Sequence, residues 1–188
     1  MDEEMGDLVS RLAEYLRTSE QQLRCFHEYK SQVEGWFKGE LICFLDQEKR
    51  AGRLPYFERE RLVYDVLGRR KNIDIALQFD KIDSSRVSWV ELKHWHIGTQ
   101  NNGNYGCRWY FRHATQPDVE KLLMIPEDGD KFILVLLTMN PGSKDWTAGV
   151  EAFNAAFPQL SVCSLTNPGD YPDYFFLGLL HVPEGGQR

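Results

Sequence analysis

Two short stretches of alternating polarity constrain this chain more than any other feature of its sequence. In residues 72–79, apolar side chains take every second position, so Asp74 points to the opposite face of an extended strand. Residues 86–93 alternate in the same way, and Glu91 and Lys93, two positions apart, share one face. Because a polar turn joins the stretches, we expect an antiparallel hairpin that brings Asp74 close to Glu91 and Lys93.

The charged residues of this hairpin indicate a chemical site. Two neighbouring carboxylates supply the oxygen ligands that a hard divalent cation prefers. The plainer alternative is a surface ion pair, because opposite charges on one face stabilise a sheet slightly. Val87 and Trp89, however, share that face of the second strand and predict burial. Burying three charges is costly, which favours a functional explanation over the ion pair.

An Asp on one strand followed by Glu-x-Lys on the next, here Asp74 and Glu91-Leu92-Lys93, resembles the PD-(D/E)xK nuclease superfamily. The resemblance implies an Mg²⁺- or Mn²⁺-dependent endonuclease that hydrolyses phosphodiester bonds of nucleic acid, with DNA favoured over RNA. It also implies that Asp74, Glu91, the Leu92 carbonyl and an acid from the preceding helix hold the metal. Lys93 would stay protonated beside the carboxylates and stabilise charge that develops at phosphorus.

The helix predicted over residues 31–50 offers two candidates for that acid. Glu40 lies within the apolar stripe, where an unpaired carboxylate is costly, so we expect it to be a catalytic residue and metal ligand. Glu34 borders the same stripe and is the second candidate. The alternative for Glu40 is a hydrogen-bonded or exposed place at the edge of the stripe. Glu60, at the start of the next strand, could approach the site from the side.

Basic and aromatic residues near the hairpin are candidates for contacting nucleic acid. A basic turn leads directly into the Asp74 strand, and residues 107–113 mix aromatic with basic side chains, which suits base stacking and phosphate contact. The same features also fit a solvated turn, and a surface strand or short helix with snorkelling arginines. The candidate contacts are Arg69, Arg70, Lys71, His94, Arg108 and Arg112.

Two other functions fit parts of the sequence. A nuclease-like scaffold can serve as a catalytically silent module that binds nucleic acid or protein, and the acidic pI of about 5.4 mildly supports this. A zinc site could use His94, His96, Cys107 and His113, whose side chains suit zinc although their spacing matches no zinc motif.

The remaining sequence predicts helices and strands around the hairpin. We expect helices over 4–29 with a break at 18–20, from Thr115 up to Pro126 and over 145–157, and strands over 59–66, 131–138, 160–165 and 174–182. Residues 31–139 then follow the α/β order of the restriction-endonuclease-like αβββαβ core, a mixed sheet flanked by helices. Residues 1–30 would be an N-terminal helical extension, 140–182 C-terminal αβ(β) additions and 183–188 a fraying tail of one domain, 1–188.

Composition favours a globular, intracellular protein. The 188 residues are 42% hydrophobic, which suits one domain with a substantial core. The net charge of −6 lacks the broad basic footprint of a protein held on nucleic acid by charge alone. The four cysteines are scattered, and no apolar segment is typical of a secretory signal or a membrane span, so we expect a cytoplasmic protein with reduced thiols and no membrane partner. A homodimer is also compatible, because one such site cuts one strand at a time.

Overall fold

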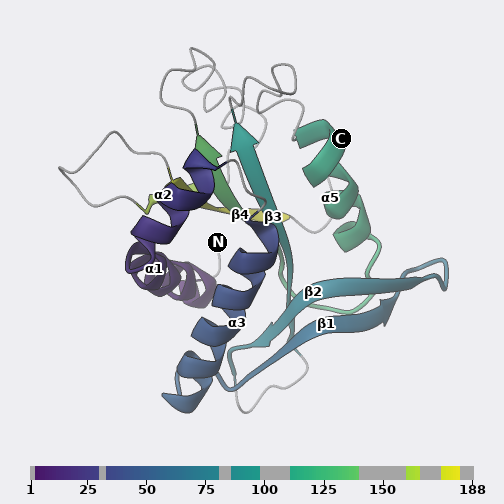
Figure 1. The fold of residues 1–188 in the computed structure, drawn as a ribbon. Coiled ribbons are helices and arrows are strands. Elements are labelled where there is room, and N and C mark those ends of the chain that lie inside the picture. The colour runs from purple at the N-terminus through teal and green to yellow at the C-terminus, as the bar shows by residue number, and fades with distance from the viewer. Residues whose placement is uncertain are drawn as a thin grey trace.

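A computed structural model describes residues 3–29, 33–80, 86–97, 111–139, 160–165 and 175–182 as an α/β protein (Figure 1). The helices are α1 (Glu3–Arg17), α2 (Glu20–Glu28), α3 (Glu34–Arg50) and α5 (Gln116–Leu123), with a short π-helical turn at Phe111–Thr115. The strands are β1 (Tyr56–Tyr64), β2 (Arg70–Gln78), β3 (Ser88–Ile97), β4 (Lys131–Met139), β5 (Leu160–Ser164) and β6 (Phe175–Val182). None of the described helices is long and apolar enough to cross a membrane.

The six strands form one mixed sheet in the order β1-β2-β3-β4-β6-β5. Consecutive strands β1, β2 and β3 are antiparallel, as a hairpin connection requires. Strand β4 is parallel to β3, so the chain must cross over between them, and α5 lies in that crossover. Strand β6 is antiparallel to both of its neighbours, β4 and β5.

The predicted elements are confirmed wherever the structure describes them, with ends shifted by a few residues. The break between the first two helices lies between Arg17 and Glu20. The strand expected over 59–66 ends earlier, because Asp65 forms a turn: its Oδ1 accepts hydrogen bonds from the amides of Leu67 and Arg69, both at 2.9 Å. The expected helix over 145–157 and the tail at 183–188 lie outside the described residues.

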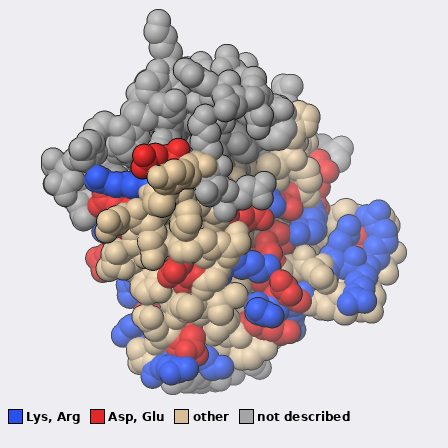
Figure 2. All heavy atoms as spheres, viewed as in Figure 1, with Lys and Arg blue, Asp and Glu red and all other residues tan. Residues whose placement is uncertain are grey.

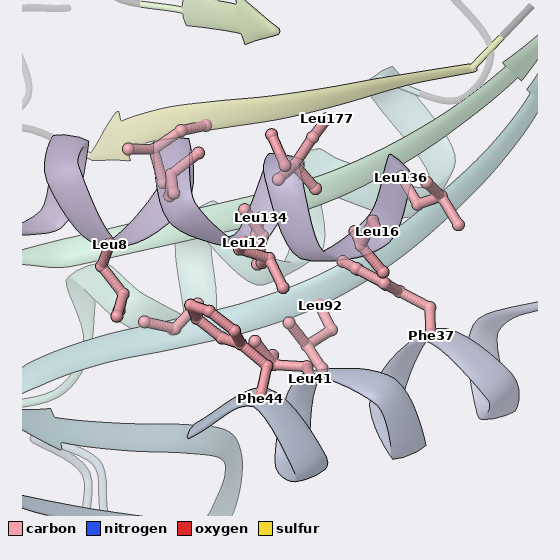
Figure 3. Close-up of a cluster of buried hydrophobic side chains, with 14 of the residues drawn as sticks. Leu8, Leu12, Leu16, Phe37, Leu41, Phe44, Leu92, Leu134, Leu136 and Leu177 are labelled. Carbon is pink, nitrogen blue, oxygen red and sulfur yellow. The ribbon is translucent and has the colours of Figure 1, made fainter. Parts of the chain in front are cut away.

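Both faces of the sheet are buried, and each by a different set of helices. Helices α1 and α3 cover one face, where leucine and phenylalanine side chains meet the sheet (Figure 3). Helix α5 covers part of the other face, which holds a second cluster that includes Trp89, Trp95 and Leu122. Period-two alternation in β3 explains the division, since Val90 and Leu92 belong to the first cluster. Burial of each such side chain contributes about 1.5–3 kcal/mol.

A buried carboxylate also joins α1 to α3. Glu48 is 2% exposed, and its Oε2 accepts hydrogen bonds from Arg11 Nε at 2.9 Å and from Arg53 Nε at 3.0 Å. The Arg53 hydrogen bond is the main cause that lowers the pKa of Glu48; burial opposes it and Arg11 adds to it. Paired in this way, the charge is tolerated inside the helical layer.

Strands β2 and β3 separate near the middle of the sheet. They pair only through Ile75 with Val90, Ala76 with Trp89 and Leu77 with Ser88. Strand β2 nevertheless stays paired with β1 as far as Arg70, and β3 stays paired with β4 as far as Ile97. The β1–β2 hairpin therefore turns away from β3, as Figure 1 shows.

Candidate active site

The two predicted carboxylates lie where β2 leaves β3. Asp74 directly precedes Ile75, the last residue of β2 that pairs with β3, and its side chain reaches that strand. Oδ2 of Asp74 accepts a hydrogen bond from the Leu92 amide at 3.0 Å. The Asp74 side chain thus replaces the main-chain partner that Leu92 loses at the divergence, which explains how the sheet can open here.

Glu91 is buried and only partly satisfied. The residue is 2% exposed, its Oε2 lies 2.6 Å from Lys121 Nζ, and its Oε1 accepts no hydrogen bond from any described residue. Burial raises the pKa of Glu91 to about 7; Lys121 opposes the shift, while the charges of Asp74 and Asp118 add to it. Close to neutral pH this carboxyl group therefore exchanges between its acid and its anion, and it would gain from a nearby cation.

The pKa of Asp74 is shifted in the opposite direction from that of Glu91, although the two carboxyl groups interact. Burial raises the pKa of Asp74, but the Leu92 amide and Lys38 lower it, and a hydrogen bond with the Glu91 side chain lowers it further. The net shift is downward, so Asp74 is an anion at neutral pH. When Glu91 carries a proton, the pair shares it, as two carboxylates in one site commonly do.

Lys93 stands beside this pair as a permanent cation. Its Nζ lies 2.8 Å from Oδ2 of Asp118, a residue of α5. Burial lowers the pKa of Lys93, but the hydrogen bond and charge of Asp118 outweigh it, together with the charges of Glu34 and Glu91, and the net pKa is raised. The expectation that Lys93 is protonated is thereby supported, which fits electrostatic stabilisation rather than general-base action.

Helix α3 contributes a lysine to the site that the sequence analysis did not identify. Lys38 Nζ lies 2.9 Å from Asp74 Oδ1 and 3.1 Å from Glu60 Oε1. Glu60 thus approaches from the side, as expected, and does so through a kink: its φ is +52° at the β1 position opposite Asp74. A positive φ is uncommon for a residue with a side chain, so the hairpin backbone is strained beside the site.

Glu40, which the sequence analysis assigns to the site, makes its described side-chain contact with α1 instead. Its Oε2 accepts a hydrogen bond from Tyr15 Oη at 2.8 Å. Burial, followed by this bond and the Glu40 charge, raises the pKa of Tyr15 to about 12. Two helical positions separate Glu40 from Lys38, a rotation of roughly 200°, so they face different neighbours. Glu34, the second candidate, does act on the site, because its charge raises the pKa of Lys93.

The predicted nucleic-acid contacts are only partly described. Arg69 Nε lies 2.8 Å from the buried Oδ2 of Asp65, Lys71 Nζ lies 4.0 Å from the same atom, and Arg70 is exposed. His94 Nε2 lies 2.9 Å from the hydroxyl of Thr138. Arg108 and the side chain of Arg112 lie outside the described residues, as do Cys107 and the side chain of His96 from the zinc alternative.

Charged groups from both helical layers and the sheet therefore meet at one place. Figure 2 shows acidic and basic side chains interleaved between the body and the hairpin. The acidic members are Glu34, Glu60, Asp74, Glu91 and Asp118, and the basic members are Lys38, Lys93 and Lys121. In the described part of the chain, no group of three or more His, Cys, Asp or Glu residues is arranged so that it could hold a metal ion.

No family model matches the chain, and neither a curated protein nor a solved structure matches it. Function must therefore be argued from the chemistry of the site itself, because a mixed α/β sheet supports many activities. That chemistry consists of two interacting carboxylates, one buried and partly unsatisfied, beside a protonated lysine.

Proposed function

We propose that this protein is a divalent-metal-dependent nuclease that hydrolyses phosphodiester bonds of nucleic acid, DNA in preference to RNA. The observation that carries the proposal is the contact of Asp74 with β3 where β2 leaves it: Asp74 Oδ2 accepts a hydrogen bond from the amide of Leu92, the residue between Glu91 and Lys93. The element order α3-β1-β2-β3-α5-β4 supports a restriction-endonuclease-like αβββαβ core, in which the Asp and the Glu-x-Lys motif lie on consecutive strands.

The residues at the site fit a small hard cation. Oε1 of Glu91 is buried without a hydrogen bond from the described residues, and the Asp74 carboxyl group interacts with it. Mg²⁺ and Mn²⁺ accept such oxygen ligands and retain several waters, so Asp74, Glu91 and the Leu92 carbonyl would suffice to hold one. A bound ion would polarise the phosphoryl oxygen and lower the pKa of a coordinated water.

The protein side chains would stabilise the developing negative charge and hold the metal ligands in position. Lys93 presents a positive charge beside the carboxylates, where it would stabilise the negative charge that builds up on the phosphoryl oxygens. Asp118 holds that ammonium group through its 2.8 Å ion pair and fixes the direction in which it points. Lys121 fixes one oxygen of Glu91 and leaves the other oxygen for the cation. Lys38 must leave Oδ1 of Asp74 if that atom is also to become a ligand.

One observation favours the second candidate, a catalytically silent module that binds nucleic acid or protein. Lys38 and Lys121 already neutralise Asp74 and Glu91, so the site is charge-compensated without a metal. In a scaffold that had lost catalysis, these ion pairs would keep the carboxylates paired and so preserve the fold. The two candidates differ in a measurable property, because only the nuclease requires that a divalent cation compete with these lysines.

Cleavage and metal binding together test the proposal. Plasmid, linear duplex, single-stranded DNA and RNA would be incubated with the protein in Mg²⁺, in Mn²⁺ and in EDTA. Calorimetric titration with Mn²⁺ would report binding independently of activity. We expect metal-dependent cleavage that Asp74→Asn and Lys93→Met abolish, and Mn²⁺ binding that only Asp74→Asn weakens strongly. Asp46→Asn, which removes a surface carboxylate of α3, is the matched control.

Three outcomes contradict the proposal in different ways. Mn²⁺ binding without cleavage of any substrate would remove the catalytic assignment and leave a metal site. Nucleic-acid binding without either cleavage or Mn²⁺ binding would establish the silent module. Equal loss of activity in Asp46→Asn and Asp74→Asn would show that the carboxylate at β2 has no special role.

A further inference from the structure

The outward face of the β1–β2 hairpin continues from the candidate site to the hairpin tip. Cross-strand partners in an antiparallel pair share a face, and Leu62 pairs with Asn72 while Tyr64 pairs with Arg70. All four are exposed, with Leu62 at 41% and Tyr64 at 57%. The next position on this face towards the body is Asp74. Arg70 and Asp74 are four positions apart along the strand, a distance of roughly 13 Å.

The other face of the hairpin is buried, so the ribbon is a fixed platform. Val63 and Ile73 are at most 4% exposed and belong to the same cluster as Leu122 of α5. The turn is held at its end as well, because the Val66 amide donates a hydrogen bond to the Met124 carbonyl at 2.9 Å. A platform held in this way keeps its exposed side chains at a constant distance from Asp74.

The hairpin end combines exposed apolar side chains with exposed basic side chains. Val66 and Leu67 at the turn are 62% and 66% exposed, next to the exposed Arg69 and Arg70. In Figure 2, Lys and Arg spheres gather on the lobe that lies where Figure 1 draws this end of the hairpin. The chain as a whole is acidic, so this local concentration of basic charge contrasts with the remaining surface.

We propose that the outward hairpin face binds an unpaired stretch of nucleic-acid strand and leads it to the candidate site; this rests on the proposed nuclease function. Tyr64 offers a ring on which a base can stack, and Arg70, its cross-strand partner, offers a charge for the adjoining phosphate. Stacking needs a base whose face is free, which paired bases do not offer. The preferred substrate is therefore single-stranded nucleic acid or an unpaired end.

Charge argues against a second copy of this chain as the occupant. An isologous dimer through the hairpin end would place two copies of Arg69 and Arg70 against each other, and like charges in contact oppose association. A polyanionic strand compensates that charge, while its bases cover the exposed apolar side chains.

Binding to a labelled single-stranded oligodeoxynucleotide, and to the same strand annealed to its complement, tests the inference. The full-length protein is used in EDTA, so that no metal-dependent cleavage takes place. We expect tighter binding to the single strand, and a loss of about 5- to 150-fold in Tyr64→Ala that Tyr64→Phe restores. Arg70→Gln should reduce the slope of log K against log salt by about 0.7, the value for one phosphate contact on a single strand.

Matched controls come from exposed residues on other elements. Tyr29→Ala removes a tyrosine that is 73% exposed, and Arg50→Gln removes an arginine at the end of α3. Neither should change the affinity or its salt dependence. Equal effects of Tyr64→Ala and Tyr29→Ala, preferred binding to the duplex, absence of binding, or a dimer that Tyr64→Ala dissociates would each overturn the inference.

Cleavage by the same variants separates this inference from the proposed nuclease function. Metal-dependent cleavage that Tyr64→Ala leaves unchanged on single-stranded substrate would overturn the hairpin assignment and retain the nuclease. Single-strand binding that depends on Tyr64 without any cleavage would retain the hairpin assignment and overturn the nuclease.

Discussion

The ammonium group of Lys38 lies 2.9 Å from Oδ1 of Asp74, so a helix residue supplies the counter-ion of the carboxylate at which the sheet opens. The same group lies 3.1 Å from Glu60, whose backbone has a positive φ opposite Asp74. Lys38 therefore pairs with two carboxylates that come from neighbouring strands. Any divalent ion that uses Asp74 Oδ1 must displace it.

Lys38→Met should strengthen divalent-cation binding. The lysine and both partners are partly exposed, so each ion pair contributes at most about 1 kcal/mol, and removing this competition should raise the Mn²⁺ affinity by about fivefold. Calorimetric titration with Mn²⁺ measures the change. Lys49→Met, which alters an α3 lysine that lies over the rings of Tyr56 and Phe57, should leave the affinity as it is. Weaker binding in Lys38→Met would instead show that Lys38 organises the carboxylates.

Glu91→Gln should stabilise the metal-free protein above neutral pH. Burial raises the pKa of Glu91 to about 7 from an ordinary value of 4.5. Between these values the folded protein holds a proton that the unfolded chain has released, so the free energy of unfolding falls as the pH rises through this window. The fall is at most about 3 kcal/mol, and the loss of the Lys121 ion pair in the variant reduces the gain.

Urea unfolding at about pH 5 and about pH 8 checks this prediction, with EDTA present to remove metals. The wild type should lose stability between the two conditions, and Glu91→Gln should lose less. Glu48→Gln provides the comparison of opposite sign, because Arg53 and Arg11 lower the pKa of Glu48 and its charge stabilises the fold at neutral pH. A wild-type stability that rises steadily from about pH 5 to about pH 8 would contradict the assignment of a raised pKa to Glu91.

The sequence was sufficient to predict the strands of the site, because period-two alternation is a local property. Alternation predicted that Glu91 and Lys93 share a face, and the polar turn predicted that Asp74 lies close to them; Asp74 does contact this strand, because its Oδ2 accepts a hydrogen bond from the Leu92 amide. It did not predict the divergence of the strands. Ile73 and Ile75 were expected to pack together, but Ile73 packs towards α5 and Ile75 towards α1 and α3, because β2 turns away from β3 between them.

The helix contributions to the site could not be predicted in the same way. Helical phase placed Glu40 within the apolar stripe, but the residue is only partly buried and phase does not determine its neighbour, which here is Tyr15 of α1. Lys38 lies outside the apolar stripe of α3, so the apolar pattern did not draw attention to it. Asp118 and Lys121 lie one helical turn apart in the helix predicted after Thr115. Their charges could have been recognised in the sequence as candidates to face Lys93.

Gly129→Ala tests the link that positions β3 beside β4. Gly129 has φ +140°, and a Cβ added there would lie 1.8 Å from the Val87 carbonyl oxygen. The next residue, Asp130, accepts the hydrogen bond from the Trp89 amide at 2.8 Å, so the clash must disturb the start of both strands. We expect a loss of at least about 2 kcal/mol in the free energy of unfolding, measured with urea.

Gly39→Ala is the control for that substitution. Gly39 lies inside α3 with no atom within 4 Å of the added Cβ, so alanine should stabilise the helix by about 0.5–1 kcal/mol. Equal stabilities of the two alanine variants would contradict the close approach of Gly129 to β3.

Asp118→Asn should slow catalysis without weakening substrate binding, because Asp118 positions Lys93 and is not proposed to contact the substrate. Burial lowers the pKa of Lys93, and the Asp118 hydrogen bond and charge are the main causes that raise it again. The variant should therefore lose about tenfold or more in kcat with little change in KM, and the alkaline limb of its pH–rate profile should move to lower pH. Steady-state kinetics across pH measures both effects, and Asp128→Asn, an exposed residue of the following turn, is the control. A lower kcat with an unmoved alkaline limb would mean that Asp118 supports the fold of α5 and does not tune Lys93.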